Sequence, residues 1–179
     1  MFRMEYQTIV DQLTMKLFAF DVGDPMRIHH LMKVHRFAQM IARAEGLDDH
    51  TRFVLECAAV VHDIGIHPAE QKYGSSNGKL QEQEGPTAAR PLLAALGLAE
   101  GDIERICYLV GHHHTYEGID GMDYQILVEA DFLVNFYEDG IGPDAIRHAR
   151  EKIFRTAAGK QLCDLLYGSR YARPGDSNR

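Results

Sequence analysis

The residues best suited to chemistry in this sequence are a histidine, a histidine–aspartate pair and a distant aspartate: His30, His62, Asp63 and Asp131. The apolar residues Val34, Phe37 and Ile41 lie within about 40° of His30 on a helix, whereas His35 lies about 140° away. His30 is therefore predicted to occupy the centre of a buried stripe. A buried imidazole needs a polar partner, which could be a metal ion or, more simply, a backbone carbonyl.

The His62–Asp63 pair ends a strongly apolar run and directly precedes Ile64 and Gly65. Two ionisable groups at the buried end of a helix are costly unless they pair with each other or bind a metal. A capping pair between the two residues is the simpler interpretation, and metal binding is the functional one.

Asp131 is set into the apolar face of another helix, with Leu127 and Val134 at about 40° and 60° from it. Buried carboxylates have a cationic partner. One metal ion would serve as the partner of His30, His62, Asp63 and Asp131 together. Two imidazoles and two carboxylates favour Mn, Fe, Co, Ni or Zn over Ca or Mg.

The ordered set resembles the HD superfamily of metal-dependent phosphohydrolases. The matching strings are His30-x-x-x-Val34, Val61-His62-Asp63-Ile64-Gly65 and Glu129-Ala130-Asp131, and the resemblance covers about residues 25–138. It implies a bundle of at least five helices with the metal between them. It also implies hydrolysis of a small phosphate ester, often a nucleotide, by metal-activated water.

Two other functions remain open at this stage. One is a di-iron oxygenase of the same fold, and the other is a non-catalytic module that binds a nucleotide signal.

A run of three histidines provides further candidates. Helical phase places His114 about 20° from the apolar stripe that precedes the run and His113 about 80° from it, with His112 on the opposite side. Relatives with two metals carry a histidine pair here and one more histidine upstream, where this sequence has Glu84. One ion is expected and a second stays open. Glu84, His113 and His114 are predicted to supply either a second site or a proton, unless the run is a solvated helix end.

Asp63 is predicted to orient the attacking water or to bridge a second ion. Residues 67–85 lose the helical pattern and are predicted to form a long loop. Its lysines, Lys72 and Lys79, are the predicted phosphate contacts, although a solvated loop would have the same composition.

The fold class predicted from periodicity is all-α, in one HD domain over residues 1–179. The core of the motif covers about 25–138. An N-terminal helix over 4–20 and C-terminal helices over 143–167 pack on it, with a break predicted at Gly159. Helices are also expected over 25–45, 49–65, 86–96, 102–112 and 124–137.

Composition restricts the remaining classes. A net charge of −7 argues against non-specific nucleic-acid binding, and no apolar run approaches the roughly 18 residues of a membrane span. Three widely spaced cysteines fit a reducing cytoplasm better than a disulfide framework. The expected partner is a small phosphate ester, and homo-oligomerisation is left open.

Overall fold

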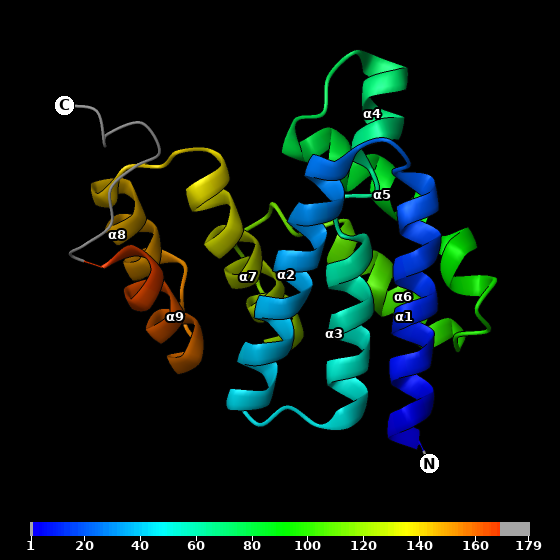
Figure 1. Cartoon of the computed structure of the whole chain (residues 1–179), viewed down its shortest axis with the longest axis horizontal. Coiled ribbons are helices and arrows are strands. Elements are labelled where there is room, and N and C mark those ends of the chain that lie inside the picture. The colour runs from blue at the N-terminus through cyan, green and yellow to red at the C-terminus, as the bar shows by residue number, and fades with distance from the viewer. Residues whose placement is uncertain (1, 169–179) are drawn as a thin grey trace.

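The computed structural model describes residues 2–168, which form nine helices and contain no strand (Figure 1). The predicted all-α class is confirmed. The helices are α1 (Phe2–Phe20), α2 (Pro25–Ala44), α3 (Asp49–Val61), α4 (Ile66–Tyr73), α5 (Gly78–Ala94), α6 (Glu100–Val110), α7 (Met122–Glu138), α8 (Pro143–Lys152) and α9 (Ala157–Tyr167). Within residues 2–168, no helix combines the length and apolarity that crossing a membrane requires.

Three helices form the centre of the bundle. α2 packs against both α3 and α7, and α3 also contacts α1, α6 and α7. In Figure 1, α1 flanks this centre on one side, while α8 and α9 lie beyond α7 on the other. Every residue of α3 from Phe53 to Val61 is buried, as expected for a helix that is apolar around most of its circumference. His62, which directly follows this buried run, therefore lies inside the protein.

The central helices begin where the sequence predicts. The Asp24 side chain accepts a hydrogen bond from the backbone N–H of Arg27, and Pro25 is the first residue of α2. Asp48 caps α3 by accepting from the N–H groups of His50 and Thr51. Side-chain caps of this type satisfy backbone donors that have no partner within the helix. They fix the starting points, and hence the phases, of the two helices that lead to His30 and His62.

The long loop predicted over 67–85 is wrong, because most of that stretch is helical. α4 covers Ile66–Tyr73, and α5 starts at Gly78 with Asn77 as its cap. Pro68 is the third residue of α4, where a backbone N–H would have no partner within the helix, so proline is tolerated. Only residues 74–77 separate the two helices.

Two glycines in this region serve close packing. A Cβ atom on Gly65 would lie 2.4 Å from the carbonyl oxygen of Gln81 and 2.8 Å from the nitrogen of Gly85. A Cβ atom on Gly85 would lie 2.6 Å from Cγ1 of Val110. The absence of side chains at these glycines brings the end of α3, α5 and α6 into direct contact.

The buried carboxylate of Glu129 on α7 forms hydrogen bonds to the segment between α8 and α9. The C-terminal helices predicted over 143–167 are separated at 153–156, not at Gly159. Glu129 Oε1 accepts hydrogen bonds from the backbone N–H groups of Arg155 (2.6 Å) and Thr156 (3.0 Å), and Glu129 Oε2 accepts from the Thr156 hydroxyl. Glu129 therefore satisfies backbone donors at the corner between α8 and α9.

Gly159→Ala should destabilise the protein. The new Cβ would lie 1.9 Å from Glu129 Oε2 and 2.6 Å from Thr156 Oγ1, and relieving such overpacking costs about 1–3 kcal/mol. Gly101→Ala in α6 is the matched control, because nothing lies within 4 Å of its Cβ position. Urea denaturation should show a lower unfolding free energy for Gly159→Ala and an unchanged or slightly higher one for Gly101→Ala. Equal stability of the two variants would contradict the clash.

Candidate metal centre

The fold brings the four predicted ligands together. His30 lies on α2, His62 and Asp63 directly follow α3, and Asp131 lies on α7. The Nε2 atom of His30 is 3.2 Å from Asp131 Oδ1, 3.4 Å from Asp63 Oδ2 and 3.2 Å from His62 Nε2. His30, His62 and Asp131 are buried. The four side chains form one compact cluster between the central helices.

The opposite ring nitrogens of both histidines are already engaged. His62 Nδ1 lies 2.9 Å from the carbonyl oxygen of Ala59, and His30 Nδ1 lies 2.7 Å from Glu138 Oε2. A carbonyl oxygen only accepts, so His62 Nδ1 carries the hydrogen and its Nε2 lone pair points into the cluster. Metal-ligating histidines are held in the same way in proteins. Two such lone pairs 3.2 Å apart need a proton or a metal ion between them.

The pKa shifts of the clustered side chains show that the cluster favours positive charge. Burial alone would lower the pKa of His30, but Asp131 and Asp63 raise it to about 9. Burial would raise the pKa of Asp131, yet His30 and His62 hold that pKa far below its ordinary value. The carboxylates are thus ionised and strongly attract positive charge. A metal ion would replace the protons that otherwise balance them.

A second group of ligand atoms shares Asp63. Asp63, His113 and His114 offer ligand atoms that all lie within 4.8 Å of one another. His113 Nδ1 donates to the carbonyl oxygen of Val110 (2.7 Å), and its Nε2 lies 3.3 Å from Asp63 Oδ1. That Nε2 atom is buried and makes no hydrogen bond to the residues that the structure describes. An unsatisfied buried nitrogen needs a partner, and an ion bound between it and the neighbouring carboxylate would provide one.

The order predicted within the histidine run needs correction. α6 ends at Val110, so helical phase does not extend to His112–His114, and His113 is the most buried of the three. His112 stacks on Tyr108 at 4.1 Å between ring centroids and lies outside both ligand groups. Burial and the neighbouring His113 lower the pKa of His114 to about 4, which leaves the neutral imidazole that metals bind.

The structure does not bring Glu84 into either ligand group. Its Oε1 accepts hydrogen bonds from Lys72 Nζ (3.0 Å) and the Tyr73 hydroxyl (2.8 Å). The contacts to His114 come instead from Gln81, whose Oε1 lies 3.0 Å from His114 Nε2, and from Glu82, whose Oε1 accepts from the His114 backbone N–H at 3.0 Å. Lys79 is exposed in the first turn of α5.

Two supporting residues on α7 are not among the predicted site residues. Asn135 Nδ2 donates to Asp131 Oδ1 at 2.9 Å, and Glu138 accepts from His30 and from Lys33. They follow Asp131 by four and seven residues, which places them on the same helical face. That spacing was the available signal.

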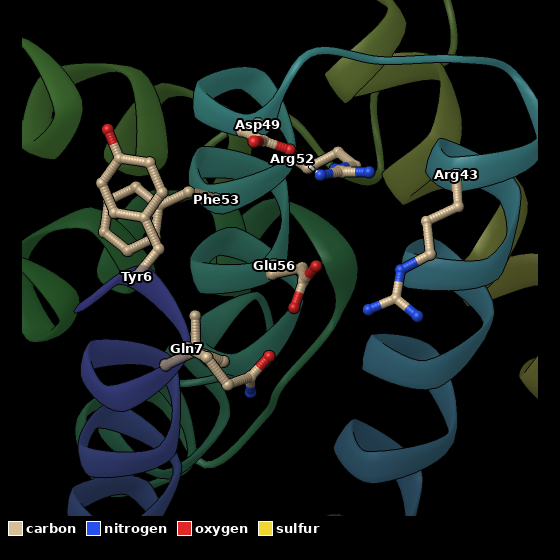
Figure 2. A pocket seen from close by; sticks show the side chains of 8 residues that line it. Tyr6, Gln7, Arg43, Asp49, Arg52, Phe53 and Glu56 are labelled. Atoms are coloured by element: carbon tan, nitrogen blue, oxygen red, sulfur yellow. Dashed lines mark hydrogen bonds and ion pairs between the residues drawn. The ribbon is translucent and has the colours of Figure 1, made fainter. Parts of the chain in front are cut away.

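His35 belongs to a different cluster from His30. Its Nε2 lies 3.2 Å from Glu56 Oε2, which also accepts from Gln39 (3.0 Å). Glu56 lines a separate cavity between α1, α2 and α3, and Figure 2 shows its carboxylate on one side of that space with Arg43 on the other. The phase difference on α2 therefore separates the two histidines as the sequence predicts.

A helical bundle with a buried histidine–aspartate centre defines the class of this protein, and comparison with known proteins gives the family. The model of the HD domain matches residues 27–157, which is more than half of the chain. The chain belongs to the HD-domain family.

One solved structure is also similar. It is a predicted HD superfamily hydrolase from an uncultured Thermotogales bacterium, with 25% sequence identity and a TM-score of 0.59, and the match covers 88% of this chain and 82% of that one. No curated protein matches the chain.

His30→Gln should lose bound metal, whereas His35→Gln should keep it. His30 Nε2 faces both carboxylates, and His35 faces Glu56 instead. Elemental analysis after loading with Mn²⁺ measures the difference. Thermal stabilisation by added metal, which follows from linkage, should persist only in the His35 variant. Equal occupancy of the two variants would remove His30 from the ligand set.

Glu56 should stabilise the fold in a pH-dependent manner. Burial would raise its pKa, but His35 and Gln39 lower it below the ordinary 4.5. A carboxylate with a lowered pKa contributes stability above its unfolded-state pKa and loses it as the pH falls. The stability difference between wild type and Glu56→Gln should thus be full at pH 7 and shrink below about pH 4.5. Urea denaturation at several pH values checks this, and a pH-independent difference would contradict it.

Proposed function

We propose that this HD-domain protein is a metal-dependent hydrolase of a small phosphate ester. The observation that carries the proposal is the shared carboxylate of Asp63, which joins the His30–His62 group to the His113–His114 group. This donor set suits a first-row transition metal, with one ion at the predicted ligands and room for a second. The match to the HD domain and the similarity to a predicted hydrolase support the same class.

The chain would hold the metal through His30, His62, Asp63 and Asp131, with His113 and His114 available for a second ion. A bound divalent metal supplies a Lewis acid and lowers the pKa of coordinated water toward neutrality. The side chain of Asp63 is 24% exposed while that of Asp131 is only 5% exposed. Asp63 is therefore the carboxylate that would accept a hydrogen bond from the attacking water and orient it.

The lysine contacts proposed from the sequence require a rearrangement. Lys72 is paired with Glu84, so it would have to leave that carboxylate to contact a phosphate. Lys79 is exposed and would have to reach the site from the first turn of α5. We assign the main positive charge at the phosphate to the metal and leave both lysines as auxiliary contacts. A nucleotide or a related monoester or diester is the proposed substrate range.

Activity should depend on both the metal and Asp63. Prolonged chelation should abolish phosphate release from a panel of nucleoside and sugar phosphates, and Mn²⁺, Co²⁺ or Fe²⁺ should restore it. Asp63→Asn should lower kcat/KM by about 100-fold or more, the range for losing a group that handles the proton of the nucleophile. Asp144→Asn, a change at a 91% exposed side chain, is the control and should have no effect.

An oxygenase would give a different result in the same assay. If the metal-loaded protein releases no phosphate from any ester and instead consumes dioxygen with an organic substrate, the hydrolase proposal is wrong. If the metal-loaded protein binds a nucleotide but neither releases phosphate nor consumes dioxygen, a non-catalytic binding module is favoured.

A further inference from the structure

A cavity of about 350 Å³ adjoins the metal centre. It shares His114 and Asp131 with the centre and continues along α7 to α8. Its size is at the lower end of the range of small-molecule sites, about 300–1,000 Å³. It therefore has room for one organic group of about the size of a nucleoside, placed beside a phosphate held at the metal.

One side of the cavity carries a row of three polar side chains from α7 and its C-terminal cap. Asp131, Asn135 and Asp139 all line it and follow one another at four-residue intervals, which keeps them on one face of α7. Over eight residues at a helical rise of about 1.5 Å, the line extends about 12 Å from the metal centre. Asp139, the C-terminal cap of α7, is exposed at the far end. Its carboxylate accepts hydrogen bonds and donates none.

The remaining walls are apolar and partly aromatic. Tyr116 and Phe132 lie 5.0 Å apart between ring centroids at an interplanar angle of 54°, and Phe132 contacts Phe136 at 5.5 Å. α8 contributes only the small side chains of Ala145 and Ala149 to the cavity. An aromatic wall facing alanines suits a flat apolar group.

The charge of the cavity restricts the ligand further. Among the described residues that line it there is no lysine or arginine, and its titratable side chains of acidic type are Asp131 and Asp139, with His114 as the one histidine. A second or third phosphate in this cavity would meet apolar walls and the Asp139 carboxylate without any compensating cation. The cavity therefore disfavours nucleoside diphosphates and triphosphates.

We propose that this cavity binds the leaving group of the substrate, and that this group is flat, uncharged, no larger than a nucleoside and equipped with an N–H or O–H donor at its far end. The assignment rests on the proposed function, because it takes the metal centre as the place of the phosphate. The substrate class is then a monophosphate ester of an aromatic or nucleoside-like alcohol. Asp139 is the residue that selects the donor, and Ala145 and Ala149 keep the space open.

The test fills the cavity from the side away from the metal. Ala145 lies on α8 and belongs to neither ligand group, so Ala145→Phe should occupy the space without removing a ligand. Asp144→Phe is the matched control, because it adds the same side chain at a neighbouring position that is 91% exposed and does not line the cavity. In metal-loaded wild type, kcat/KM should be at least about 10-fold higher for adenosine 5′-monophosphate than for glycerol 3-phosphate or adenosine triphosphate, a difference of about 1.4 kcal/mol. Ala145→Phe should remove that preference, and Asp144→Phe should retain it.

A binding measurement separates this inference from the proposed function. Adenosine and naphthol carry no phosphate, so calorimetric titration reports on the cavity whether or not hydrolysis occurs. Both should bind wild type and Asp144→Phe, and both should bind Ala145→Phe at least about 10-fold more weakly. The melting temperatures of the two variants without ligand should be similar. Asp139→Asn should weaken the binding of adenosine more than the binding of naphthol, because adenosine offers more hydrogen-bond donors. Binding without phosphate release would keep the cavity assignment and reject the hydrolase. Equal binding by Ala145→Phe, or a wild-type preference for the triphosphate, would overturn the cavity assignment.

Discussion

The structure depends on placing ionised carboxylates among the buried apolar residues of its central helices. Asp63 follows a helix whose residues from Phe53 onward are all buried, and Asp131 lies in a helix that is buried around most of its circumference. An isolated carboxylate in such surroundings would be strongly destabilising. The imidazoles of His30, His62 and His113 surround the two carboxylates. A cation bound between them would complete the compensation, so the packing of the bundle and the proposed metal binding have the same physical origin.

Helical phase predicted that His30 and Asp131 face the interior because both residues sit on long helices. His30 and Asp131 occupy positions where the surrounding apolar residues define the buried face, and His35 is separated from His30 by the same reasoning. Phase failed for His112–His114 because α6 ends at Val110. In that turn the backbone, held by Glu82 through the His114 N–H, decides which imidazole faces Asp63. A tertiary contact of this kind has no local signature in the sequence.

The region after Asp63 shows a second limit of local reasoning. Glycine and proline between 65 and 86 predict a loop, but Gly65 and Gly85 permit close contact between helices and Pro68 occupies a tolerated first-turn position. Because the stretch is helical, Lys72 meets Glu84 across two helices, which the loop interpretation could not foresee. The same helices place Gln81, not Glu84, against the His114 ring.

α7 connects the metal centre to the C-terminal helices because its opposite faces carry different polar residues. Asp131 and Asn135 face the centre, while Glu129, two residues before Asp131 and about 200° from it around the helix, satisfies the backbone at the corner between α8 and α9. Phe154, from that corner, packs against Phe136 at 6.2 Å between ring centroids. The position of α8, which supplies the alanine wall of the cavity, is thus fixed through the same helix that supplies Asp131. A shift of α7 would move both Asp131 and the far wall of the cavity. One structural element therefore fixes the histidine–aspartate cluster and the cavity beside it relative to each other.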